Sequence, residues 1–105
     1  MSLSIMSNYD ESRNCQKISL KGEIDLDTAE QFRSELKKVT EQKIMDIVID
    51  MSQLDYIDSS GLGILIGTLK RLKTQNKDIY LNSLKDNVKK VFTITGLDKI
   101  FLMEV

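Results

Sequence analysis

Two neighbouring serines, Ser59 and Ser60, occupy the segment of this sequence that is best suited to chemistry. They belong to the stretch Asp-Ser-Ser-Gly-Leu-Gly at residues 58–63, which separates an apolar run from a run with helical periodicity. A serine at the start of a helix caps it, because its hydroxyl lies near backbone N–H groups that have no partner inside the helix. The two glycines allow a second backbone or a ligand to come close. We therefore take this segment as the candidate functional site.

Phosphorylation is the chemistry that suits a serine in this position. A phosphate adds about −1.5 to −2 charges at neutral pH, and a helix N-terminus stabilises such a charge by roughly 0.3–1 kcal/mol. The fold should persist, whereas a partner fitted to a neutral hydroxyl would meet repulsion beside Asp58 and a desolvation cost. The segment could therefore act as a switch. A simpler interpretation stays open at this point, namely that Ser59 only caps a helix.

Catalytic motifs that contain a serine differ from this segment. A phosphate-binding loop continues with Gly-Lys-Ser or Gly-Lys-Thr, and a nucleophile elbow needs Gly-x-Ser-x-Gly with a histidine. The sequence has neither motif and no histidine. Asp50 invites comparison with the phosphorylated aspartate of a receiver domain, but the accompanying acidic pair is missing, so we interpret Asp50 as a solvated strand end. We expect no enzyme activity, no catalytic residue, no cofactor and no metal.

The elements on either side of the segment follow from the spacing of apolar residues. Leucine and isoleucine recur every three or four positions from Leu62 to Leu72, which predicts an amphipathic helix that starts near Ser59. Residues 44–50 form a nearly continuous run of β-branched character, typical of a strand covered on both faces. We therefore expect helices on each side of the sheet. Residues 52–55 have the composition of a turn between this strand and the helix.

The N-terminal third of the chain predicts an edge hairpin followed by a helix. Short alternating runs around Ile5 and Ile18 flank a polar cluster, and Gly22 marks the end of the second run. Asp27 is placed to cap a helix, with Glu30 at the spacing of a capping box. The apolar face of this helix contains Ala29, Phe32, Leu36 and Val39.

The C-terminal third adds a strand at residues 78–82, a third helix capped by Ser83 and ended by Gly96, and a last strand at residues 100–103. The resulting order is β-β-α-β-α-β-α-β. Strands that alternate with helices imply right-handed crossovers and parallel pairing. We therefore predict an α/β fold with a mixed, mostly parallel sheet of about five strands and helices packed on it.

Length and composition are those of one ordinary globular domain spanning residues 1–105. The chain is 41% hydrophobic and 30% charged, with a net charge of −1, so no strong field favours nucleic acid or an anionic membrane. Its apolar runs are too short to span a bilayer, and no secretion signal is visible. A single cysteine, Cys15, excludes an internal disulfide and suits a reducing, cytoplasmic setting. We expect Cys15 to pack as a small apolar residue.

Three stretches, taken in order, make the sequence similar to the STAS domain of bacterial anti-sigma factor antagonists. They are Gly22-Glu23-Ile24-Asp25, the segment at residues 58–63, and Thr95-Gly96-Leu97. The resemblance covers nearly the whole chain, and it implies the STAS fold. It also favours a modified serine at residue 59 over a serine that is only a helix cap.

The resemblance implies a cycle of binding and phosphorylation. In such antagonists the unphosphorylated form binds an anti-sigma factor that is also an ATP-dependent serine kinase, which frees a sigma factor. The kinase modifies the first serine of the motif, here Ser59, and the complex separates; Ser60 is the second choice. A PP2C-type serine phosphatase restores the active form. The implied partner-binding residues are Glu23, Asp25, Asp58, Ser59, Ser60, Gly61, Leu62 and Gly63.

An alternative hypothesis keeps the fold but assigns the chain to a transport complex or another multiprotein complex, without phosphorylation. Such STAS subunits often lack an intact phosphorylatable motif, whereas this chain keeps one, so we rank the antagonist first. Two features concern the ends of the chain. Met1-Ser2-Leu3 resembles a cloning remnant, and the sequence stops at Val105 where many family members continue into a further helix.

Overall fold

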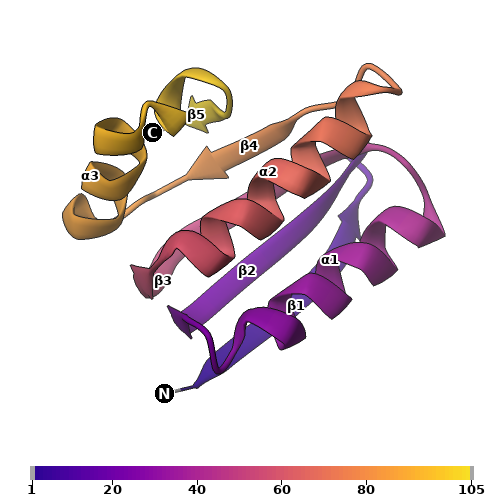
Figure 1. Cartoon of the computed structure of the whole chain (residues 1–105). Coiled ribbons are helices and arrows are strands. Elements are labelled where there is room, and N and C mark those ends of the chain that lie inside the picture. Colours follow the sequence, from indigo (N-terminus) through magenta and orange to yellow (C-terminus); the bar gives the residue numbers. More distant parts are fainter. Residues whose placement is uncertain (1, 105) are drawn as a thin grey trace.

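The computed structural model describes residues 2–104 (Figure 1). Met1 and Val105 lie outside the described residues, and the interpretations given above for the two ends of the chain involve both of them. The element order β-β-α-β-α-β-α-β is confirmed. The elements are β1 (Leu3–Asp10), β2 (Cys15–Ile24), α1 (Ala29–Gln42), β3 (Asp46–Ile57), α2 (Ser59–Lys73), β4 (Ile79–Asn82), α3 (Asp86–Thr95), the 3-10 turn η1 (Leu97–Lys99) and β5 (Leu102–Glu104).

The strands form one mixed sheet in the spatial order β1-β2-β3-β4-β5. β1 and β2 pair antiparallel, from Leu3 opposite Gly22 to Asp10 opposite Cys15, which confirms the predicted edge hairpin. The remaining neighbours pair in parallel. The carboxyl ends of β2 and β3 therefore lie side by side, and the helices that follow these two strands begin at the same edge of the sheet.

The helices cover one face of the sheet, so the expectation of helices on both faces is wrong. From β2 to β5 each new strand is added on the same side of its predecessor, and right-handed crossovers then place every connecting helix on the same face. Figure 1 shows α1 and α2 lying side by side on that face. Phe32 of α1, Leu65 of α2 and Phe92 of α3 join a single apolar cluster with Ile49 of β3.

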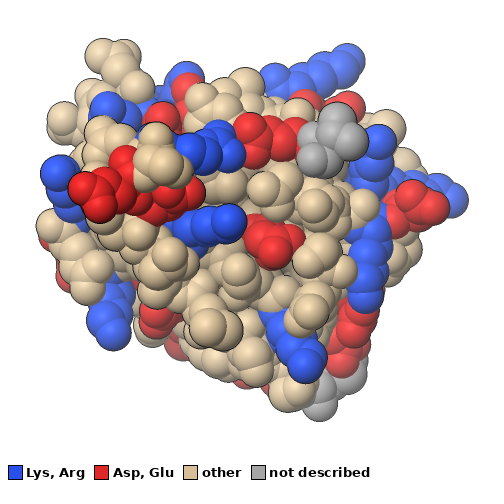
Figure 2. Space-filling view, turned by 180° about the vertical axis from the view of Figure 1, so that it is seen from behind, with Lys and Arg blue, Asp and Glu red and all other residues tan. Residues whose placement is uncertain are grey.

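The opposite face of the sheet carries no helix, and Figure 2 shows much of it as uncharged surface with scattered charges. Val48 belongs to this face and is still only 2% exposed, because it lies between Lys17 of β2 and Tyr80 of β4. Long neighbouring side chains can therefore bury a central strand residue without a helix above it. A continuous run of buried strand residues therefore does not by itself predict helices on both faces of a sheet.

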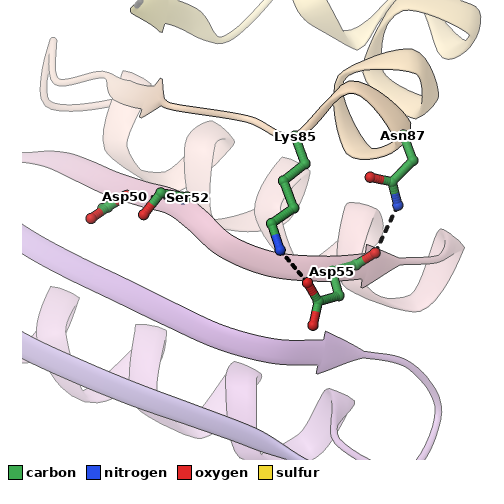
Figure 3. Close-up of polar contacts among 5 residues, drawn as sticks. All are labelled: Asp50, Ser52, Asp55, Lys85 and Asn87. Carbon is green, nitrogen blue, oxygen red and sulfur yellow. Dashed lines mark hydrogen bonds and ion pairs between the residues drawn. The ribbon is translucent and has the colours of Figure 1, made fainter.

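Two strands extend further than the sequence predicted. β3 continues through residues 52–55 to Ile57, so those residues form no turn, and Asp50 lies inside the strand and not at its end (Figure 3). β2 likewise passes through Gly22 to Ile24. Gly22 adopts φ +111° at a shift in register, and a Cβ there would lie 2.2 Å from the carbonyl oxygen of Ser2. The glycine thus marks an irregularity within the strand, not a strand end.

The third helix begins later than predicted. Its N-cap is Lys85, and the predicted cap, Ser83, instead has a left-handed backbone with φ +59°. The start of α3 is held against β3 by an ion pair between Lys85 and Asp55 and by a hydrogen bond from Asn87 Nδ2 to the Asp55 carbonyl oxygen at 2.7 Å (Figure 3). Tertiary contacts therefore replace a local side-chain cap.

The predicted ends of the C-terminal elements hold in part. Gly96 ends α3 as predicted, with φ +76°. The last strand begins at Leu102 and not at Ile100, because the 3-10 turn η1 and its C-cap take up the preceding residues. Cys15 is 2% exposed and packs as predicted, and burial raises the pKa of its thiol.

Candidate functional site

The site forms where β2 and β3 end beside each other. Ile24, the last residue of β2, pairs with Ile57, the last residue of β3. One residue later, the backbone N–H of Asp58 donates to the carbonyl oxygen of Ile24 at 3.2 Å. Two of the three sequence stretches singled out above, residues 22–25 and residues 58–63, are thus joined directly. The third stretch lies at the end of α3, where Gly96 terminates the helix.

The residue that caps α2 is Asp58, so the simpler interpretation of Ser59 as the helix cap is wrong. Asp58 has an extended backbone, and its Oδ1 accepts a hydrogen bond from the backbone N–H of Ser60 at 2.9 Å. The Ser60 hydroxyl donates to the same oxygen. The Asp58 carboxylate therefore accepts both hydrogen bonds that Ser60 donates in the first turn of the helix, one from its backbone N–H and one from its hydroxyl.

Ser59 is left as the exposed first residue of α2. Its hydroxyl makes no hydrogen bond with any residue in the described part of the chain, whereas the hydroxyl of Ser60 is half-buried and bound to Asp58. A modifying enzyme can reach the first hydroxyl without breaking a contact. This difference favours Ser59 over Ser60 as the reactive serine.

The two glycines of the segment have different roles. A Cβ on Gly61 would lie 2.6 Å from Cγ2 of Ile24 and 2.8 Å from Cγ1 of Ile57, so only a glycine lets α2 begin this close to both strands. A Cβ on Gly63 would meet no atom within 4 Å. Gly61 is therefore required by packing, and Gly63 leaves the helix surface open to solvent. Leu62, between them, is buried and belongs to the apolar cluster.

Asp25 holds the loop between β2 and α1. It is 9% exposed, and its Oδ1 accepts hydrogen bonds from the backbone N–H groups of Asp27 at 2.9 Å and Thr28 at 3.1 Å. Thr28, not Asp27, is the N-cap of α1, so the predicted capping box with Glu30 does not form. The Thr28 hydroxyl donates to the carbonyl oxygen of Glu23 at 2.9 Å and accepts from the backbone N–H of Asp25 at 3.0 Å.

The edge of the sheet where β2 and β3 end is acidic and carries two exposed apolar side chains that the sequence did not single out. Glu23 and Asp58 are half-buried, and Asp27 is exposed. Leu26, in the loop after β2, is 83% exposed, and Tyr56, opposite Glu23 in the sheet, is 43% exposed. The signal that could have found Leu26 is an isolated leucine between two aspartates, ahead of the first residue of α1.

Similarity to known proteins agrees with this geometry. The profile of the STAS domain family matches residues 7–105. The anti-sigma-B factor antagonist of Staphylococcus aureus is 32% identical over 81 residues, which cover 77% of this chain and 75% of that protein. The chain belongs to the STAS domain family of anti-sigma factor antagonists. Among residues 2–104, none of the STAS domain's helices is long and apolar enough to cross a membrane.

Solved structures place the fold in the same family. The anti-sigma factor antagonist SpoIIAA in its unphosphorylated form superposes with a TM-score of 0.81 at 25% identity, covering 97% of this chain and 89% of that one. The phosphorylated form of the Bacillus cell fate determinant SpoIIAA gives a TM-score of 0.72 at 23% identity, with 97% and 92% covered. The second likeness concerns the fold alone. Together they confirm the STAS architecture, with its five-stranded mixed sheet.

Proposed function

We propose that this STAS domain is a phosphorylation-controlled anti-sigma factor antagonist with Ser59 as its switch. The unphosphorylated protein binds an anti-sigma factor that is also a serine kinase, and a sigma factor is released. Phosphorylation of Ser59 ends the binding, and a PP2C-type serine phosphatase reverses it. The cycle takes place in the cytoplasm. The observation that supports this proposal best is the exposed hydroxyl of Ser59 at the first position of α2, which has no hydrogen-bond partner among residues 2–104.

Three features of the site support a phosphate that changes binding and leaves the fold intact. The Ser59 side chain makes no hydrogen bond, within the residues described, that phosphorylation would break. The helix N-terminus offers a favourable electrostatic environment for the phosphate. Asp58, adjacent in sequence, and Glu23 and Asp27 in the neighbouring junction already make this edge acidic. A kinase surface matched to that charge meets about two additional negative charges after transfer.

Partner contact would centre on the same edge. Besides Ser59 and Gly63, the exposed apolar side chains Leu26 and Tyr56 provide surface that loses contact with water when a partner binds. Apolar and aromatic anchors surrounded by polar residues are typical of binding hot spots. We therefore add Leu26 and Tyr56 to the proposed interface. Asp25 and Gly61 contribute indirectly, because they position the two junctions.

The experiment compares binding and release across serine variants. The wild-type protein, Ser59→Ala, Ser59→Asp and Ser60→Ala are each mixed with the anti-sigma factor kinase that co-purifies with the protein from its native cells, then with ATP. Wild type and Ser60→Ala should bind and be released by ATP. Ser59→Ala should bind and stay bound, and Ser59→Asp should fold but bind at least about tenfold more weakly, as expected for like charges brought together.

Two outcomes would reject the proposal. One is release of Ser59→Ala by ATP at the wild-type rate, which would exclude Ser59 as the acceptor. The other is stable co-purification with a transport ATPase in place of a kinase, which would favour the role of a STAS subunit in a transport complex. Thermal unfolding of each variant controls for damage to the fold.

A further inference from the structure

The helices α1 and α2 lie side by side on the helical side of the molecule (Figure 1). Residues of both helices line a groove, which forms a second surface. The groove is a hollow of about 300 Å³. Three cations line it, namely Arg33 and Lys37 from α1 and Arg71 from α2, and its lining contains no carboxylate. In a chain of net charge −1, this concentration of positive charge is a local feature and not a reflection of overall composition.

Two glycines of α2 form part of the floor of the groove. Gly63 and Gly67 lie one helical turn apart on the exposed side of α2, and a Cβ on either would meet no atom within 4 Å. A glycine inside a helix lowers helix stability relative to alanine, and the packing of this chain does not require one at either position. Thr68 donates its hydroxyl to the Ile64 carbonyl oxygen at 2.8 Å, so its side chain folds back onto the helix. A second backbone can therefore approach α2 closely.

We propose that the α1–α2 groove binds an acidic helix of a partner protein. From Gly63 to Arg71 the floor extends about 12 Å along α2, at 1.5 Å per residue, which matches roughly two turns of a partner helix. Carboxylates spaced three or four residues apart would face Arg33, Lys37 and Arg71. The groove shares only Gly63 with the segment at residues 58–63, so this inference is independent of the Ser59 switch.

The cations of the groove are available to a partner. Arg33 pairs with Glu30 at 3.2 Å, but both side chains are more than half exposed, at 60% and 77%. Such exposed pairs contribute little and exchange readily. Lys37 and Arg71 are exposed and form no ion pair within residues 2–104. An acidic helix would therefore displace at most one weak internal contact.

The test uses the full chain labelled with ¹⁵N and a capped peptide of about 20 alanine and glutamate residues, long enough to form a helix. Amide shifts should change along α1 and α2, with Gly63 and Gly67 among the largest. Arg33→Glu with Arg71→Glu should weaken binding about tenfold or more, whereas the matched pair Lys38→Glu with Lys90→Glu, exposed outside the groove, should change it less than about twofold. Gly67→Leu should abolish binding by filling the floor, while the amide spectrum stays folded.

Three results would overturn the proposal. The first is an equal loss of peptide affinity in the Arg33→Glu, Arg71→Glu variant and in the control variant with Lys38→Glu and Lys90→Glu. The second is equal binding of a peptide in which glutamine replaces glutamate, because that would remove the role of charge. The third is a single-stranded oligonucleotide, or inorganic phosphate alone, that shifts the same amides at lower concentration than the acidic peptide. That result would assign the groove to phosphate and not to an acidic helix.

Discussion

The two strand-to-helix junctions at the edge of this STAS domain begin alike and differ in what they leave exposed. In each, an isoleucine ends a strand and an aspartate follows, Asp25 after β2 and Asp58 after β3. Asp25 is buried and bonds to two backbone N–H groups of its own loop. Asp58 bonds to Ser60, and the Ser59 hydroxyl has no hydrogen-bond partner in the described part of the chain.

The residue three positions after each aspartate accounts for much of the difference. In the first junction this residue is Thr28, whose hydroxyl links the loop to β2 through the Glu23 carbonyl oxygen. In the second it is Gly61, whose missing side chain lets α2 begin against Ile24 and Ile57. Hydrogen bonds from side chains of the loop hold the first junction in place. The second is held by the packing of α2 against the ends of both strands. The comparison shows how one edge of a sheet can hold both a rigid support and an accessible hydroxyl.

The largest effect that would test this comparison is expected at Asp25. Asp25→Ala should lower the free energy of unfolding by about 2–4 kcal/mol, because its buried carboxylate accepts charge-assisted hydrogen bonds from the backbone N–H groups of Asp27 and Thr28. Without it, the Thr28 N–H keeps only the Asp25 carbonyl oxygen at 3.2 Å. Asp27→Ala is the matched control, since Asp27 is exposed and contributes its backbone N–H, which alanine keeps. It should change the free energy by less than about 0.5 kcal/mol. Urea unfolding measures both, and equal effects would show that Asp25 does not support the junction.

Opposite effects are expected at the two glycines of the second junction. Gly61→Ala should cost about 1–3 kcal/mol, because its Cβ would overlap Ile24 and Ile57. Gly63→Ala should stabilise by about 0.5–1 kcal/mol, because alanine favours the helix and the site is open. Chemical unfolding of the two variants in parallel gives the comparison. A stabilised Gly61→Ala would mean that α2 does not begin as close to the strands as the structure places it.

A smaller effect should separate Asp58 from Ser59. Asp58→Ala should cost about 1 kcal/mol, the usual loss for an N-cap. Ser59→Ala should stay within about 0.5 kcal/mol of wild type, because the serine hydroxyl has no partner among residues 2–104. Thermal unfolding would check both values. If Ser59→Ala lowers the free energy of unfolding as much as Asp58→Ala does, then Ser59 is part of the helix cap. In that case the hydrogen bonds of Asp25 and Asp58 do not explain the difference between the junctions.

The sequence predicted the element order, the edge hairpin and the mostly parallel sheet, because periodicity and turn residues report these features directly. It did not predict which face the helices cover. That outcome depends on the strand order in space, and the burial of Val48 between Lys17 and Tyr80 imitated a second helical layer. The helix after β3 begins at Ser59 as predicted, with Asp58 as its N-cap. The N-caps of α1 and α3 are Thr28 and Lys85 in place of Asp27 and Ser83, and neither makes a side-chain cap hydrogen bond that spacing could reveal.

The sequence predicted where the candidate site lies better than it predicted the role of each residue in it. The resemblance to STAS domains brought residues 22–25 and 58–63 together, and the structure joins them through Asp58 and Ile24. Asp25 was expected at a partner surface, but its carboxylate faces its own loop. Leu26 and Tyr56 were missed, because the exposure of an apolar side chain depends on the path of the chain and not on its local pattern.

The most direct test of the central claim is to purify the protein from the cells that produce it and map phosphate by intact-mass and peptide mass spectrometry. We predict a single phosphate on Ser59 in part of the population, and a kinase bound only to the unphosphorylated part. Absence of phosphate across growth and stress conditions, or phosphate on Ser60 alone, would contradict the account.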